Sequence, residues 1–71
     1  MILKVSSNTD IGALKTSILG YLKSHKSVCI DCIGEKPNYI ATRAIIMAKM
    51  QMPYNKTFYA EPKFVILDTP E

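Results

Sequence analysis

Residues 28–49 read VCIDCIGEKPNYIATRAIIMAK, and this stretch decides the fold. Its first six residues, 28–33, are short and rich in β-branched side chains, which predicts a strand that ends at Gly34. Pro37 then marks the start of a predicted helix, because proline is common in the first turn of helices. Five apolar residues then recur at the spacing of one helix face: Ile40, Ala41, Ala44, Ile45 and Ala48. They predict the buried face of a helix over about residues 37–50.

The residues before this block predict one more strand and one more helix. Residues 2–6 alternate apolar and polar side chains, with Leu3 and Val5 on one face. Four residues that favour helix N-termini occupy positions 7–10, and any of them can accept a hydrogen bond from the first backbone N–H groups. Apolar residues then recur at helical spacing as far as Leu22, which predicts a helix over about residues 9–24.

The residues after the block predict further strands. Residues 57–60 and 64–67 are aromatic or aliphatic runs, and Pro62 interrupts or bends the chain between them. The element order is then β-α-β-α-β, with residues 64–67 as a further β segment. Crossover connections between parallel strands are right-handed, so both helices should lie on one face of a small sheet. The sequence therefore predicts a single α+β domain over residues 1–71, a compact two-layer sandwich.

Length and charge narrow the class of protein. The chain has 71 residues, 48% of them hydrophobic, and a net charge of +3. No apolar run approaches the roughly 18 residues that a membrane span needs, and the first residues do not resemble a signal peptide, so we expect a cytoplasmic protein. The positive charge is compatible with a nucleic-acid partner without requiring one. A single core of this size is marginal, which favours self-association.

No cluster of residues points to an enzyme, a metal or a cofactor. Cys29 and Cys32 have C-x-x-C spacing but lie within the predicted strand, where they should point to opposite faces. We therefore expect two reduced thiols that bind no metal. His25, the single histidine, follows the first helix without a carboxylate nearby in the sequence, so a structural or surface role is favoured.

The start of the second helix is the best candidate for binding. Free backbone N–H groups and the helix dipole can hold a phosphate there. Four side chains would add charge, an amide and a ring for stacking: Lys36, Asn38, Tyr39 and Arg43. Three further lysines supply outlying charge: Lys4, Lys15 and Lys49. The alternative is an ordinary capped helix with solvated charges.

The second helix also has more apolar surface than one sheet can cover. Ile46, Met47 and Met50 come in addition to its buried face. This pattern predicts a second apolar contact, and we expect a homodimer or a higher even-numbered homo-oligomer. The alternative is that Met50 and Met52 wrap over the edge of the core, which flexible methionine side chains do readily.

Four segments carry a resemblance to a known family. They are Leu3-Lys4-Val5-Ser6-Ser7, Val28-x-Ile30-x-x-Ile33-Gly34, Ala41-x-Arg43-Ala44-Ile45-x-x-Ala48-Lys49 and Pro62-x-Phe64. Together they resemble stage V sporulation protein S over most of the chain. That family is similar in fold to the Alba chromatin proteins, which implies an Alba-like sandwich, and it would fit a bacterial or bacteriophage origin.

The chain departs from the family pattern in two places. Tyr39-Ile40 stand where the family has an Asn-Gln pair, and Arg43 alone keeps the basic position that follows. The family pattern also continues past Pro62-x-Phe64 through a hairpin to a closing strand, whereas here Asp68-Thr69-Pro70-Glu71 follow and we expect a truncated C-terminus. In Alba proteins the corresponding hairpin reaches along DNA. The resemblance implies binding of DNA or RNA through backbone phosphates with little sequence specificity. The alternative is a protein-interaction or assembly module that acts in sporulation or cell-cycle regulation without touching nucleic acid.

Overall fold

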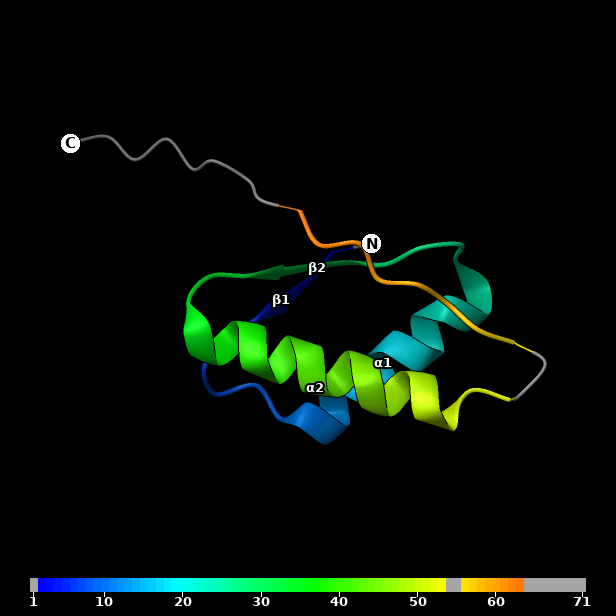
Figure 1. Cartoon of the computed structure of the whole chain (residues 1–71), viewed down its shortest axis with the longest axis horizontal. Coiled ribbons are helices and arrows are strands. Elements are labelled where there is room, and N and C mark those ends of the chain that lie inside the picture. The colour runs from blue at the N-terminus through cyan, green and yellow to red at the C-terminus, as the bar shows by residue number, and fades with distance from the viewer. Residues whose placement is uncertain (1, 54–55, 64–71) are drawn as a thin grey trace.

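The computed structural model describes residues 2–53 and 56–63, and four elements lie within them. In chain order they are β1 (Ile2–Val5), α1 (Ile11–Ser24), β2 (Cys29–Cys32) and α2 (Glu35–Gln51). β1 and β2 are parallel, with Ile2 opposite Cys29 and Val5 opposite Cys32. Both helices lie on the same side of this two-stranded sheet (Figure 1). The predicted small two-layer α+β architecture is therefore confirmed.

The ends of α1 are fixed by local hydrogen bonds. Asp10 is the residue of the polar run that caps the helix, since its Oδ2 accepts a hydrogen bond of 2.8 Å from the N–H of Ala13. At the other end, the N–H of His25 donates to the carbonyl of Tyr21 at 2.8 Å. The helix consequently begins two residues later than predicted and ends where predicted.

α2 begins at Glu35, two residues earlier than predicted, because Gly34 turns the chain directly from β2 into the helix. Gly34 has φ 99°, a conformation that side-chain-bearing residues rarely adopt. A Cβ there would meet no atom closer than Pro37 Cδ at 3.8 Å, so the backbone angle, and not lack of space, is what favours glycine. Pro37 is buried within the first turn of the helix.

The core forms where α2 meets α1 and the sheet. α2 lies against both strands, and α1 packs along α2. The buried side chains are Val5, Leu14, Ile18, Ile40, Ala41, Ala44 and Ala48. Four of the five residues predicted for the buried face of α2 are therefore buried, and the fifth, Ile45, is half-buried. The alanines allow the backbones to approach closely.

The predicted strand over residues 57–60 is wrong. These residues carry no strand, and the sheet has two strands in the part of the chain that the structure describes. Prolines at 53 and 62 flank the segment and lack the N–H that a β-ladder needs. The segment is anchored instead by the side chain of Phe58, which packs against the core. The predicted strand over residues 64–67 lies outside the described residues.

Neither described helix has the length and apolar character that crossing a membrane would require.

Candidate functional site

Tyr39 and Arg43 form a pair on the exposed face of α2. Arg43 Nη1 donates a hydrogen bond of 3.0 Å to Tyr39 Oη, and the guanidinium carbon lies 5.8 Å from the centroid of the tyrosine ring. The two residues are one helical turn apart, which allows this contact. Tyr39 is 57% exposed, so much of its ring is open to solvent. The guanidinium has five N–H donors. One of them donates to Tyr39, so the others can donate to an anion.

Lys36 and the backbone of the first turn lie at the start of the same helix. Gly34 offers no side chain to cap α2, and the first N–H groups of a helix lack intrahelical partners. The partial positive charge at this end favours an anion, and the exposed Lys36 adds a full charge. Glu35, in the same turn, places a carboxylate beside them.

The amide of Asn38 is engaged within the protein. Its Nδ2 donates to the carbonyl of Gly34 at 2.6 Å, and its Oδ1 accepts from the thiol of Cys32 at 3.1 Å. The side chain therefore joins the start of α2 to the end of β2. The sequence indicated an amide available to a ligand, whereas the structure gives Asn38 a role in positioning the helix start.

The three outlying lysines do not gather at this site. Lys4 stands opposite Asp31 in the sheet, on the face turned away from the Leu3 and Val5 side chains that pack on the core. Lys15 is half-exposed on α1. Lys49 is thirteen residues beyond Lys36, about 20 Å along the helix, and its Nζ lies 5.3 Å from the centroid of the Tyr59 ring.

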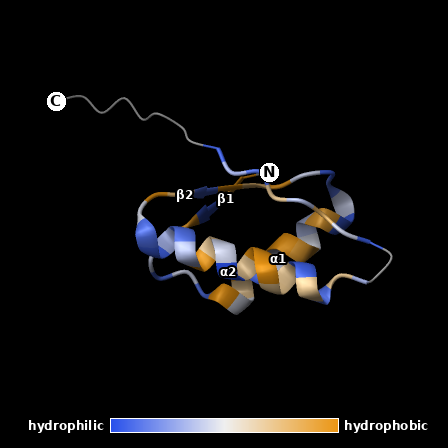
Figure 2. Cartoon of the chain, in the orientation of Figure 1, coloured by the Kyte–Doolittle hydropathy of each residue, from blue (hydrophilic) through white to orange (hydrophobic). Residues whose placement is uncertain are grey.

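The exposed face of α2 continues from this site into an apolar half. Ile46 is 50% and Met50 79% exposed, whereas Met47 is half-buried on the flank of the helix. Together with Tyr39 and Arg43, Ile46 and Met50 follow the spacing i, i+4, i+7, i+11, which places all four on one face. We call these four residues the exposed stripe. Hydrophilic colours mark the first turn of α2 in Figure 2, and hydrophobic colours appear farther along the helix.

The cysteines and the histidine occupy the positions that the sequence indicated. Cys29 is exposed and lies 3.8 Å from Asp31 Oδ1, while Cys32 is half-buried against the core, so the two thiols are on opposite faces of β2. His25 ends α1, with Nδ1 3.2 Å from the carbonyl oxygen of Tyr21. Within residues 2–53 and 56–63, no three metal-ligating side chains come together. That these thiols stay reduced and metal-free remains a prediction.

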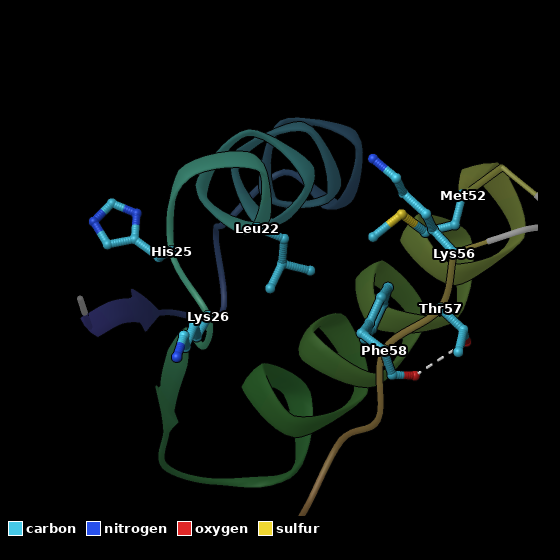
Figure 3. Close-up of a pocket in the computed structure, with 7 residues that line it drawn as sticks. All are labelled: Leu22, His25, Lys26, Met52, Lys56, Thr57 and Phe58. Atoms are coloured by element: carbon cyan, nitrogen blue, oxygen red, sulfur yellow. Dashed lines mark hydrogen bonds between the residues drawn. The ribbon is translucent and has the colours of Figure 1, made fainter.

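Sequence reasoning missed a groove at the C-terminal ends of the two helices. It consists of two adjoining hollows that share Leu22, Met52 and Lys56; the one that reaches Leu19 is mainly apolar, whereas the one that reaches Phe58 is slightly more polar than apolar. Its rim carries three lysines: Lys23, Lys26 and Lys56. We call this the helix-end groove, and part of it is shown in Figure 3. Lys23 and Lys26 are close because they are only three residues apart, but the return of Lys56 to the same place depends on tertiary structure.

Comparison with known proteins agrees with the resemblance in the sequence. The family model described as Stage V sporulation protein S (SpoVS) matches residues 1–71. No curated protein and no solved structure gives a significant match to the chain.

Proposed function

The chain belongs to the stage V sporulation protein S family, and we propose that it binds DNA or RNA through backbone phosphates as a homo-oligomer. Family membership supports a small, sporulation-related protein. The observation that carries the proposal is the Tyr39–Arg43 pair beside Lys36, at a helix start without a side-chain cap.

The chemistry of this site suits the backbone of a nucleic acid. A guanidinium held against a tyrosine ring is oriented before a ligand arrives, so less side-chain entropy is lost on binding a phosphate. The exposed tyrosine ring can stack on a base of any identity. Backbone contacts of this kind fix position without reading the base sequence, which is why we propose little sequence specificity.

The apolar half of the exposed stripe gives the oligomer its contact. Ile46 and Met50 lie seven and eleven residues beyond Tyr39, about 10 and 16 Å along the helix. Arg43 lies only three residues, about 4.5 Å, before Ile46, so a second copy that covers Ile46 and Met50 would leave Lys36 open and have Arg43 at the edge of its contact. A two-fold dimer would then present two phosphate sites at once, which strengthens binding to a long polyanion.

The test is a gel-shift titration with duplex DNA and with single-stranded RNA at about 50 and about 200 mM salt. The double variant Lys36→Glu, Arg43→Glu should lose binding and keep its fold, because both side chains are exposed. The matched control is Lys63→Glu, which changes the charge by the same amount per residue. Lys63 is exposed and belongs to the segment after α2. Equal affinity for the double variant and the unchanged protein would contradict the site at the start of α2.

The exposed stripe also supports the second candidate, an assembly module that does not bind nucleic acid. Ile46 and Met50 together offer an apolar contact to another chain. Such a contact responds weakly to salt, whereas phosphate binding falls steeply as salt rises. Oligomer formation without any gel shift at the lower salt concentration would favour this second candidate.

A further inference from the structure

The helix-end groove brings Lys56 near two lysines from the end of α1 and the loop after it: Lys23 lines one hollow of the groove, Lys26 lines the other, and Lys56 lines both. Lys23 belongs to the last turn of α1, Lys26 to the loop before β2, and Lys56 to the segment after α2. The N–H of Lys56 donates to the carbonyl of Pro53 at 2.9 Å, and this turn brings the chain back toward the groove. In Figure 3, Lys26 and Lys56 lie on opposite sides of the view, with Leu22 between them.

Helix dipoles account for Lys23 but not for Lys26 or Lys56. Two helix C-termini meet near the groove, and together they amount to roughly one negative charge. Lys23 and Lys49 already occupy the last turns of α1 and α2 and can offset it. Lys26 and Lys56 are surplus to that role, and no carboxylate is among the described residues that line the groove. The groove is therefore positive in excess of what the fold needs.

We propose that the helix-end groove binds an acidic amphipathic peptide segment of a partner protein. Apolar side chains of the segment would lie against Leu19, Leu22 and Met52, in the apolar part of the groove, and its carboxylates would meet the lysines on the rim. This partner follows from charge complementarity combined with an aliphatic floor. Phe58 packs against the core, so its ring is a poor platform for a nucleic-acid base.

The proposal is independent of phosphate binding at the start of α2. Lys23 is thirteen residues before Lys36, and the groove lies at the opposite end of α2 from Gly34. Variants at Lys36 and Arg43 should therefore leave peptide binding unchanged. Loss of nucleic-acid binding without loss of peptide binding would separate the two surfaces.

The experiment is fluorescence anisotropy with a labelled twelve-residue peptide in which leucine alternates with glutamate. Two control peptides carry serine in place of leucine or lysine in place of glutamate. We expect the acidic leucine peptide to bind and each control peptide to bind at least about tenfold more weakly, because both the apolar floor and the charge are needed. Equal binding of the serine peptide would overturn the proposal, since charge alone would then explain the affinity.

Variants locate the binding on the protein. Lys26→Gln with Lys56→Gln should weaken peptide binding about tenfold, as expected for the loss of two exposed ion pairs. Met52→Gln should weaken it severalfold. Lys63→Gln is the matched control for charge, and circular dichroism verifies the fold of each variant. If Lys63→Gln weakens binding as much as the double variant, or if a twelve-nucleotide single-stranded DNA displaces the peptide, the proposal is wrong.

Discussion

The two faces of α2 differ in the size of their side chains. The face toward α1 and the sheet carries Ala41, Ala44 and Ala48, of which the last two are fully buried. The opposite face carries the exposed stripe, in which each of four residues is a large side chain: Tyr39, Arg43, Ile46 and Met50. The packed face therefore combines three small residues with Ile40 where the helix lies close to its neighbours, whereas the four large residues of the exposed stripe remain open to solvent among the described residues.

The difference separates folding from binding along one helix. An alanine face buries little area per residue, so its contribution depends on close packing with neighbours. A large apolar or aromatic side chain in water contributes to folding only weakly and becomes favourable when a partner covers it. Substitutions on the first face should therefore change stability, and substitutions on the second should change association.

Ala44→Leu should have the largest effect on stability. Ala44 has no exposed surface, so the added atoms must displace α1 or the sheet. Overpacking of this kind costs about 1–3 kcal/mol, a large part of the stability of a domain this small. The check is chemical denaturation. Thr42→Leu, at an exposed position on the same helix, is the control and should change stability by less than about 0.5 kcal/mol. Equal effects of the two variants would contradict the distinction between the faces.

Ile46→Lys should weaken self-association at least about tenfold, because a charge in a dry apolar contact loses hydration and gains no partner. Analytical sedimentation of the 71-residue chain at micromolar concentrations measures the strength of self-association. Thr16→Lys adds the same charge at an exposed position of α1 and should leave association unchanged. A stable monomer of the unsubstituted chain would show that the exposed stripe has another purpose.

The buried face of α2 was predictable because its spacing is a property of the helix alone. The same holds for the placement of Cys29 and Cys32 on opposite faces, which follows from the period of a strand. The residues 57–60 were mispredicted because their aromatic character suits a strand, while pairing depends on a neighbour that sequence alone does not supply.

The site was less predictable than the fold. Spacing along α2 brought Tyr39 and Arg43 together correctly, since both lie on one helix. The hydrogen bond between Asn38 and Cys32 joins two elements across the turn at Gly34, and the helix-end groove joins the end of α1 to the segment after α2. Such contacts depend on tertiary structure, which the residue pattern does not contain.

Asn38→Ala tests the hydrogen bonds by which Asn38 joins α2 to the end of β2. Its effect on stability should be smaller than that of Ala44→Leu. Loss of the hydrogen bonds to Gly34 and Cys32 should lower the unfolding free energy by about 1 kcal/mol. The Cys32 thiol should also react faster with a thiol reagent, because it loses its acceptor. Thr42→Val removes one hydrogen bond within α2, to the Asn38 carbonyl, and is the control. Unchanged thiol reactivity in Asn38→Ala would contradict the link.

Glu35→Gln should have the smallest effect, and its direction is informative. The Glu35 carboxylate interacts favourably with the partial positive charge at the start of α2. Its neutralisation should therefore lower the free energy of unfolding by about 0.3–1 kcal/mol. The same carboxylate repels a phosphate at the start of α2, so the affinity for duplex DNA should rise about two- to fivefold at low salt and converge with the unsubstituted protein at high salt. Glu61→Gln removes an equal charge from the segment after α2 and is the control. A rise in affinity confined to Glu35→Gln locates the phosphate at this helix start, whereas equal rises in both variants would reflect net charge alone and contradict the site.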